Sequence, residues 1–468
     1  MEVTSPMGDP RPGEVRALHR SGPNRSLAPV TRAPSSVLHT DHYELTMVAA
    51  AIDAGIADHP CVFEAFVRRL PEGRRYGVVG GIGRLVEALR RFTFGPEELA
   101  WLGAHGLVPD RTLEWLAAYR FGGSITAYRE GELYFPGSPV LRVEGGFAEA
   151  VVLETLVLSV LNYDSAIASA AARMVTAADG RALLEFGSRR AHEEAAVAAA
   201  RVAWLMGFAA TSNLEAGRRW GVPTSGTSAH AFTLVFHDEL EAFRAQVAAL
   251  GAGTTLLVDT YDVEQGLEHA VEAAGPGLGA VRIDSGDLAE EVHKARARLD
   301  AMGATGTQIV VSGDLDEYAI AALRDAPADA YGVGTHLVTG SGAPTGEFVY
   351  KLVATADREG AVFRPVAKGG GVKATVGGTK RAWRELDADG RAVAEVVTTG
   401  DQPVPANARA LQVAVVVDGE EQPQPDADAL RAAHQYAKAE LPPSAQDLDP
   451  GPPALPTRSL TRDADPDA

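Results

Sequence analysis

Two side chains of opposite charge lie close together in the segment Arg282-Ile283-Asp284-Ser285-Gly286-Asp287. The apolar run that contains them, residues 280–284, has the length of a buried strand. Successive side chains of a strand point to opposite faces, so Arg282 and Asp284 share one face. As a purely structural pair they would be costly to desolvate and would stabilise the fold little. The segment therefore favours a binding or catalytic role for both side chains.

A glycine-rich turn follows a second strand-like run. Its sequence, Gly332-Val333-Gly334-Thr335, lets backbone N–H groups approach a phosphate without obstruction by a Cβ atom, and Thr335 adds a hydroxyl. Turns of this composition also occur without any ligand, as simple tight turns. The pattern alone leaves both interpretations open.

Aromatic and cationic side chains in Glu185–Arg190 suit a flat, negatively charged ligand. Phe186 can stack on a planar ring, and Arg189 can hold a carboxylate through two parallel hydrogen bonds. The alternative is a pair of solvated arginines at the start of a helix. His230 ends the segment Gly226-Thr227-Ser228-Ala229-His230. It is either a nucleophile or proton carrier, or a histidine whose hydrogen bonds are satisfied within the fold.

Alternating strand and helix patterns position these residues. The predicted strands are 183–186, 254–258, 280–284, 308–312 and 330–334, and the predicted helices are 190–220, 262–274, 287–302 and 314–325. This alternation predicts βα units and a parallel sheet, hence an α/β fold. Several strands end in polar or glycine residues, such as Asp259, Ser312 and Gly313. Because ligands bind at the carboxyl ends of parallel strands, we predict a barrel-like site there.

The flanking segments differ from this pattern. Residues 37–148 mix helical and strand patterns, and residues 362–416 are strand-rich. We predict one discontinuous domain made of residues 37–148 and 362–440, with a barrel domain of residues 149–361 inserted between them. The two ends, residues 1–36 and 441–468, are rich in proline and lack apolar periodicity, which predicts disorder.

Composition narrows the function classes. The net charge of −19 argues against nonspecific nucleic-acid binding, which needs a basic surface. No apolar run approaches the ~20 residues of a membrane span, and the first residues lack the apolar core of a secretory signal. The single cysteine, Cys61, excludes an intrachain disulfide and fits a reducing compartment. We expect a cytoplasmic enzyme of small molecules, without nucleic-acid or membrane partners.

Six segments in order along the chain resemble the nicotinate phosphoribosyltransferases, a family of type II phosphoribosyltransferases. They are Thr40–Met47, Phe63–Arg69, Phe186–Arg190, Gly226–His230, Arg282–Asp287 and Gly332–Thr335, and the similarity spans roughly residues 37–384. The resemblance implies an irregular α/β barrel joined to a sandwich-like domain built from both ends of the chain. It also implies an ATP-dependent, ligase-type enzyme of NAD salvage.

The resemblance implies roles for the residues around the pyridine ring. Family enzymes work as dimers with shared active sites, so Tyr43 would reach into the site of a second subunit. There it would clamp the ring from the face opposite Phe186. The side chains of Arg189, Thr227 and Arg282 would contact nicotinate.

The implied reaction moves phosphoribosyl from phosphoribosyl pyrophosphate to nicotinate and releases nicotinate mononucleotide and pyrophosphate. The 5′-phosphate would lie on Gly332–Thr335, near Gly313, and Mg²⁺ would neutralise the pyrophosphate. Asp284 and Asp314 would hold the sugar as positive charge develops on it. His230 matches the histidine that family members phosphorylate with ATP, which would drive the equilibrium toward product. No residue is assigned as a resident metal ligand.

A basic segment after the barrel departs from the family pattern. Lys368, Lys373 and Lys380 keep its basic positions, which would contact phosphate or ATP, but glycines replace the family's serine and proline. This replacement implies a looser loop.

Three alternatives compete with this prediction. A nicotinamide-specific enzyme would carry an aspartate near Ser212 and Asn213, whereas these neutral residues tolerate the carboxylate of nicotinate. A barrel aldolase or isomerase would need a lysine or metal ligands at the strand ends. A sensor would keep the pocket without turnover, although Asp284, His230 and Asp314 are all present.

Overall fold

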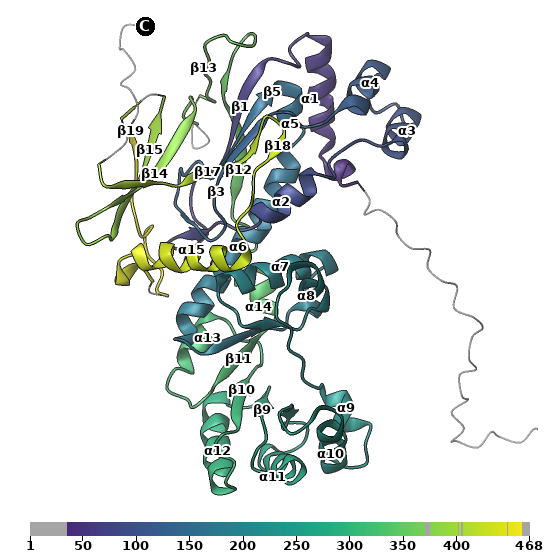
Figure 1. Ribbon diagram of the computed structural model, residues 1–468, viewed down its shortest axis with the longest axis vertical. Helices are drawn as coiled ribbons and strands as arrows, with labels where there is room; N and C mark the ends of the chain where they lie inside the picture. Colours follow the sequence, from purple (N-terminus) through teal and green to yellow (C-terminus); the bar gives the residue numbers. More distant parts are fainter. Residues whose placement is uncertain (1–34, 370–374, 401, 404–405, 447, 461–468) are drawn as a thin grey trace, which may run out of the picture. The chain divides into compact units, whose positions relative to one another are not determined.

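The computed structural model describes residues 35–460 apart from 370–374, 401, 404–405 and 447. These residues form β-sheets of seven, six, four and two strands, packed with helices (Figure 1). The predicted disordered segment 1–36 lies almost entirely outside the described residues.

The six-stranded sheet contains the predicted βα units. Its strand order is β7-β6-β11-β10-β9-β8, and every neighbouring pair is parallel. The strands are β6 (Ala182–Glu185), β7 (Ala210–Thr211), β8 (Thr255–Leu257), β9 (Ala280–Ile283), β10 (Gln308–Val311) and β11 (Ala330–Val333). The predicted α/β fold with a parallel sheet is confirmed. In the part of the chain that the structure describes, β7 and β8 do not pair with each other, so the sheet is an open half-barrel.

Helices connect these strands and begin at aspartate caps. The side chains of Asp262, Asp287 and Asp316 each accept a hydrogen bond from a backbone N–H of the first turn that follows. The helices of this region are α6 (Glu154–Ala178), α7 (Glu193–Met206), α8 (Leu214–Trp220), α9 (His230–Leu234), α10 (Glu239–Leu250), α11 (Val263–Ala274), α12 (Leu288–Ala301), α13 (Glu317–Ala322) and α14 (Thr335–Val338).

The single long helix predicted for residues 190–220 is wrong. The helix α7 ends at Gly207, whose φ of 125° only glycine adopts readily, and Phe208 then turns into the core. Strand β7 follows and pairs with β6 before α8 begins. The alanine-rich composition hides this break because alanine suits the helix on both sides of it.

The seven-stranded sheet joins segments from both ends of the chain. Its order is β13-β12-β1-β5-β3-β17-β18, with antiparallel neighbours throughout. The strands are β1 (Pro60–Val67), β3 (Ser124–Tyr128), β5 (Leu141–Gly146), β12 (Phe348–Thr355), β13 (Arg364–Pro365), β17 (Gln412–Val417) and β18 (Glu420–Glu421). The predicted end of the barrel segment at 361 lies too far along the chain, because β12 pairs with β1.

Short elements pack around this sheet. They are η1 (Val37–His39), α1 (His42–Asp53), β2 (Gly77–Val78), α2 (Ile82–Leu89), α3 (Pro96–Ala104), α4 (Asp110–Ala118), β4 (Leu133–Tyr134) and α5 (Phe147–Val151). Between β6 and α7 lies the single turn η2 (Ser188–Arg190).

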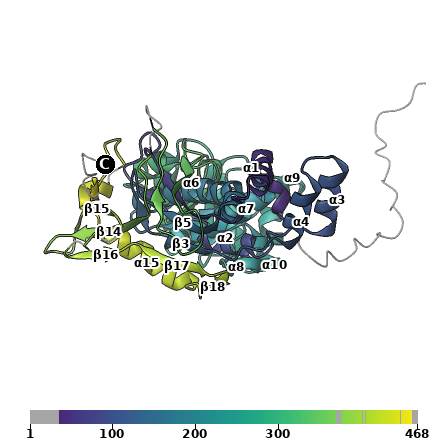
Figure 2. The same ribbon diagram turned by 90° about the horizontal axis from the view of Figure 1, so that it is seen from above.

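The described residues near the end of the chain include further helices and strands. The four-stranded sheet contains β14 (Lys380–Leu386), β15 (Ala392–Thr399), β16 (Ala408–Ala410) and β19 (Thr457–Leu460), and Figure 2 shows the first three beside α15 (Ala427–Glu440). The predicted disorder is therefore wrong for residues 441–460, which include η3 (Pro443–Gln446) and β19. Proline-rich composition conceals Leu441, Ala445 and Leu455, which are buried in the core. Residues 461–468 lie outside the described residues.

Helix α6 is shared by both halves of the molecule. Val157 and Leu161 belong to the core beneath the seven-stranded sheet, while Ile167 and Met174 belong to the core of the parallel sheet. The stretch 147–178 is long and apolar enough to cross a bilayer by composition, but most of its apolar window is buried in the fold, which is typical of a core helix.

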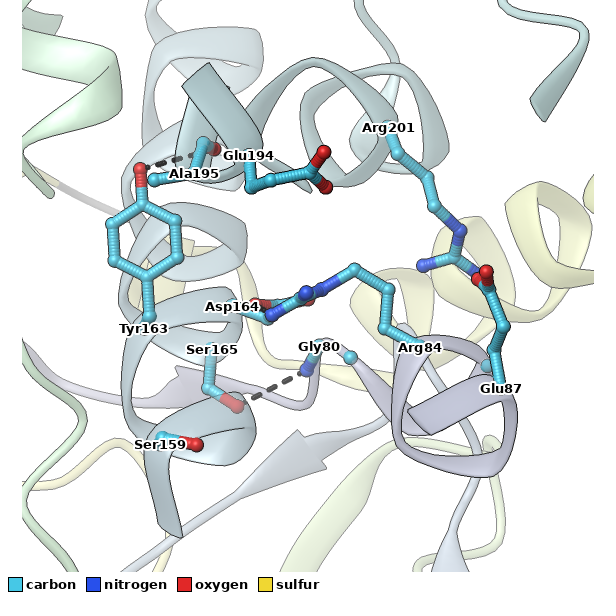
Figure 3. A network of polar contacts seen from close by, with 12 residues as sticks. Gly80, Arg84, Glu87, Ser159, Tyr163, Asp164, Ser165, Glu194, Ala195 and Arg201 are labelled. Carbon is cyan, nitrogen blue, oxygen red and sulfur yellow. Dashed lines mark hydrogen bonds and ion pairs between the residues drawn. The ribbon is translucent and has the colours of Figure 1, made fainter. Parts of the chain in front are cut away.

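Polar contacts fix α2 against α6 and α7 (Figure 3). The guanidinium group of Arg84 forms two hydrogen bonds of 2.9 and 3.0 Å with the buried carboxylate of Asp164 on α6. The backbone N–H of Gly80 donates to the Ser165 hydroxyl at 3.1 Å. On α7, Arg201 pairs with Glu130 at 2.7 and 2.8 Å. These contacts position the N-terminal helices against the helices of the half-barrel.

We predict that buried His434 makes the fold sensitive to mild acid. Its Nδ1 lies 2.9 Å from the Gly131 carbonyl oxygen, and its buried Nε2 meets no hydrogen-bond partner within the described ranges. Burial lowers the pKa of His434 from 6.5 to about 4. The unfolded chain therefore binds the proton more readily, and stability falls as the pH drops through this window, by about 2 kcal/mol at pH 5.

Chemical denaturation of wild type and His434→Gln at pH 7 and pH 5 measures this contribution. At pH 7 the variant should have a lower free energy of unfolding than wild type. Between pH 7 and pH 5 its free energy of unfolding should fall by about 2 kcal/mol less than that of wild type. Gln in place of the exposed His105 of α3 is the control and should leave the wild-type loss unchanged. An equal loss in His434→Gln and wild type would contradict the prediction.

Candidate active site

The carboxyl ends of the parallel strands bring polar side chains to one edge of the sheet. Asp259 follows β8, Asp284 follows β9 and Ser312 follows β10, and these strands are neighbours in the sheet. Gly332 lies in β11, and Phe186 follows β6. Because all these strands run in the same direction, their ends meet where parallel α/β folds bind ligands.

Arg282 lies at the centre of this edge. The Nη1 group of Arg282 donates a hydrogen bond to the Thr227 hydroxyl, and its Nη2 lies 3.7 Å from Oδ1 of Asp284. The guanidinium carbon lies 5.8 Å from the centre of the Phe186 ring. Asp284 in turn accepts a hydrogen bond from the Ser312 hydroxyl. The structure therefore brings together Arg282, Asp284, Thr227 and Phe186.

The charge of Arg282 is poorly compensated. Burial lowers its pKa although the carboxylates of Asp284 and Asp259 act in the opposite direction, and the nearby charge of Arg189 lowers it further. Its Nε is buried, and no residue in the described part of the chain forms a hydrogen bond with it. Arginine remains charged in proteins, so binding of an anion close to Arg282 and Arg189 lowers the free energy of the site.

His230 lies against a buried carboxylate that the sequence did not single out. Its Nε2 is 3.9 Å from Oδ1 of Asp259, and its Nδ1 is 3.2 Å from the Thr260 hydroxyl. The Asp259 side chain is only 2% exposed, and its Oδ1 has no hydrogen-bond partner among the described residues. Its Oδ2 accepts hydrogen bonds from the Asp284 backbone N–H at 3.0 Å and from the Ser285 hydroxyl at 2.6 Å. Asp259 is thus fixed with one bare oxygen facing the imidazole.

The signal for Asp259 was its position directly after a predicted strand. The strand end is visible in the sequence, but the sequence pattern indicates no role for Asp259. A buried carboxylate oxygen without a donor is costly, and such groups cluster at functional sites. Asp259 and Thr260 therefore extend the predicted site.

Phe186 lies directly on Gly332. A Cβ atom at position 332 would come within 2.5 Å of the Phe186 ring and 3.1 Å of the Ser312 Cβ. Gly332 is buried within β11, so in this structure its missing side chain makes room for the ring. Gly332 therefore packs against the Phe186 ring instead of lining the predicted phosphate loop. Gly334 and Thr335 remain as the residues of that loop that are less buried.

Gly313 and Asp314 form a strained turn after β10. Gly313 has a φ of 122°, and a Cβ atom there would be 2.6 Å from the Asp284 carbonyl oxygen. Asp314 also has a positive φ, 52°, and its Oδ2 is 3.6 Å from Nε2 of His336 in α14. The Asp314 side chain is exposed and free to meet a ligand. His336 is a neighbour that the sequence did not indicate.

The neutral residues Ser212 and Asn213 have different roles. The side-chain oxygen of Asn213 caps α8 by accepting from the Ala216 N–H at 2.8 Å, and its amide donates to the Ser188 hydroxyl at 2.9 Å. Asn213 is therefore engaged within the fold, whereas Ser212 is exposed. Beneath them, Thr211 hydrogen bonds to buried Glu185, whose pKa is raised by burial.

Two of the three lysines of the basic segment lie in the part of the chain that the structure describes. Lys380 is buried, and its Nζ is 2.8 Å from Oε2 of Glu64 in β1, so its charge is already neutralised. This contradicts the prediction that it contacts phosphate or ATP. Lys368 is exposed, and Lys373 lies outside the described residues.

Tyr43 lies in the first turn of α1 and is 44% exposed. Burial of its hydroxyl and the neighbouring Glu154 raise its pKa. Within one chain, the described residues show no aromatic contact between Tyr43 and Phe186.

The described residues contain no group of three or more His, Cys, Asp and Glu side chains that could hold a metal ion. Asp284 and Asp314 instead offer separate carboxylates. Mg²⁺ is usually bound through one or two carboxylates together with substrate phosphates. The residues present fit a cation that arrives with a polyphosphate.

We predict that Gly332→Ala destabilises the protein. The added methyl group must displace the Phe186 ring, and overpacking of this kind costs about 1–3 kcal/mol. Urea denaturation measures the loss. Gly253→Ala is the control, because a Cβ atom there meets nothing within 4 Å, and its stability should stay within about 0.5 kcal/mol of wild type. Equal stability of the two variants would show that the ring does not occupy this position.

Known proteins share this arrangement along most of the chain. Residues 38–162 match the model of the nicotinate phosphoribosyltransferase N-terminal domain, and residues 182–357 match that of the nicotinate phosphoribosyltransferase family. The chain is 54% identical over 450 residues to nicotinate phosphoribosyltransferase pncB1 of Mycobacterium tuberculosis, covering 93% of this chain and 98% of that protein.

Human relatives agree in sequence and in structure. The chain is 32% identical over 453 residues to human nicotinate phosphoribosyltransferase, covering 82% of this chain and 83% of the relative. The crystal structure of human nicotinic acid phosphoribosyltransferase superposes with a TM-score of 0.77 at 28% identity, covering 91% of this chain and 97% of the other. The chain therefore belongs to the nicotinate phosphoribosyltransferase family.

Proposed function

We propose that this chain transfers the phosphoribosyl group of phosphoribosyl pyrophosphate to the ring nitrogen of nicotinate, in a reaction coupled to ATP through His230. The products are nicotinate mononucleotide and pyrophosphate, and the reaction is the first step of NAD salvage from nicotinate. The observation that carries the proposal is the contact chain from His230 through Asp259 to Asp284 and Arg282 at one sheet edge.

Nicotinate is flat and carries one negative charge, and the edge offers a partner for each property. The Phe186 ring provides a stacking face, held in place by Gly332. Arg282 and Arg189 provide the positive charge for the carboxylate, and Thr227 orients Arg282 through its hydroxyl. We propose that Tyr43 of a second subunit covers the other face of the ring, which makes the enzyme a homodimer with shared sites.

Asp284 acts on the sugar. As the C1′–O bond to pyrophosphate stretches, positive charge develops on the ribose ring, and a fixed carboxylate nearby stabilises it. Ser312 and the pairing with Arg282 hold Asp284 in place. The lone pair of the nicotinate nitrogen forms the new bond to C1′ as pyrophosphate leaves. Asp314, Gly313, Gly334 and Thr335 surround the phosphoribosyl end. Asp284 and Asp314 would hold Mg²⁺ together with the pyrophosphate, whose negative charge the cation would neutralise.

Asp259 prepares His230 for attack on ATP. Its bare oxygen favours the tautomer that carries the proton on Nε2, which leaves Nδ1 unprotonated. The Nδ1 lone pair, which faces the Thr260 hydroxyl at 3.2 Å before ATP binds, then acts as the nucleophile. Attack of Nδ1 on the γ-phosphorus would release ADP and form phosphohistidine, whose later hydrolysis releases phosphate. The 41% exposure of the His230 side chain leaves room for the nucleotide.

The preference for nicotinate over nicotinamide rests on neutral surroundings. A nicotinamide-specific enzyme would carry an aspartate near Ser212 and Asn213. The Asn213 side chain is engaged by Ser188 and by the cap of α8, so we propose that the exposed Ser212 is the one that contacts the ligand. A hydroxyl tolerates a carboxylate, whereas an aspartate there would repel it. We also propose a cytoplasmic location, without nucleic-acid partners, in keeping with the net charge of −19.

We predict product formation from nicotinate only. Purified protein receives phosphoribosyl pyrophosphate and Mg²⁺ with nicotinate, nicotinamide or quinolinate, with and without ATP, and the product is identified by mass. Mononucleotide from nicotinamide alone would overturn the substrate assignment. Failure with all three pyridines would favour a sensor.

We predict that His230→Ala abolishes stimulation by ATP while some ATP-independent transfer remains. Asp259→Asn should weaken ATP stimulation by about 10-fold or more, because the amide no longer selects the reactive tautomer. Initial rates with and without ATP, and acid-labile labelling by γ-labelled ATP, measure both effects. Unchanged labelling of His230→Ala would remove this histidine from the mechanism.

A further inference from the structure

The first turns of α1 and α6 are joined by one buried carboxylate. Glu44 is 0% exposed. Its Oε1 accepts hydrogen bonds from the backbone N–H of Thr155, at 2.8 Å, and from the Thr155 hydroxyl. Its Oε2 accepts a hydrogen bond from the Thr40 hydroxyl. We call this arrangement of Thr40, Glu44 and Thr155 the α1–α6 clamp.

The clamp has no cation. The described residues show no ion pair to Glu44, and burial raises the pKa of Glu44 to about 7 although the Thr155 hydrogen bonds lower it. A buried carboxylate is costly unless its hydrogen bonds are satisfied. Neighbouring Leu45 and Val48 show that the same helix can pack through apolar side chains alone. Hydrogen bonds fix the orientation of a side chain more closely than apolar packing does, because their distances and angles vary over a narrow range.

Tyr43 is the residue whose direction this clamp sets. Consecutive residues of an α-helix point about 100° apart, so fixing Glu44 inward holds Tyr43 outward. Tyr43 is 44% exposed, and Glu154, which precedes Thr155, lies beside its hydroxyl. The adjacent residues Tyr43 and Glu44 of α1 thus lie against the adjacent residues Glu154 and Thr155 of α6.

We propose that Glu44 is a positioning residue for nicotinate binding, which acts through the α1–α6 clamp by presenting the Tyr43 ring to the site of a second subunit. The inference rests on the proposed function, since it assumes that Tyr43 covers the pyridine ring. The groups proposed to hold phosphoribosyl pyrophosphate come from the strand ends and do not touch the clamp. Loss of the clamp should therefore weaken nicotinate binding selectively.

Steady-state kinetics of the full chain test this inference. Glu44→Gln and Thr155→Val should each raise the KM for nicotinate by about fivefold, the effect of one net hydrogen bond, with kcat and the KM for phosphoribosyl pyrophosphate within about twofold of wild type. Ser159→Ala is the control, because its exposed hydroxyl on α6 bonds only to the Leu156 carbonyl oxygen, and its kinetics should match wild type.

A double-mutant cycle separates positioning from general stability. Tyr43→Ala alone should raise the nicotinate KM, and adding Glu44→Gln should raise it no further. The inference is overturned if the two effects multiply, if Glu44→Gln lowers kcat and raises both KM values together, or if Tyr43→Ala changes nothing. Should Glu44→Gln fail to fold, the same cycle with the milder Thr155→Val decides. Absence of nicotinate turnover in wild type would instead refute the proposed function itself.

Discussion

The buried carboxylate of Asp259 connects the parts of the site. One of its oxygens holds the backbone N–H of Asp284 and the Ser285 hydroxyl, and the other faces His230. This is possible because β8 and β9 are parallel neighbours, which places the end of one strand beside the first turn after the other. From Asp284 the contacts continue to Ser312. Asp259 thereby links His230, after the end of one strand, to Asp284, after the end of the next.

The electrostatics of the site oppose those of the whole chain. The net charge is −19, yet the edge of the half-barrel presents the half-buried Arg282 with its charge incompletely balanced and the exposed Arg189 close by. Desolvation strengthens the attraction between a cation and an incoming anion because the effective dielectric constant is low. The carboxylates of Asp284 and Asp259 lie close enough to Arg282 to offset part of its charge. Opposite charges are thus separated along one short edge, as a reaction between an anion and a developing cation requires.

The periodicity of the sequence predicts the strands of the parallel sheet but not the break in the helix that follows its first strand. Strands such as 280–284 and 330–334 were found within a residue or two because apolar runs bounded by glycine and polar residues have few other interpretations. The break at Gly207 was missed, since alanine favours helix on both sides. Asp259 was noted only as a strand end, because neither its burial nor its orphan oxygen is visible in a sequence. Lys380 was misjudged for the same reason: its partner Glu64 is 316 residues away.

The pairing of Glu64 with Lys380 shows that a segment resembling a binding motif can act through the fold. Glu64 in β1 accepts hydrogen bonds from both the backbone N–H and the Nζ of Lys380. Glu44 in the first segment is likewise buried and serves the packing of α1 on α6. In both cases a carboxylate fixes an element, while Tyr43 of α1 and Arg69 beyond β1 stay exposed, Arg69 in an ion pair with Glu347. Buried polar residues of these segments therefore set the direction of the exposed ones, because a hydrogen bond constrains rotation where apolar contact does not.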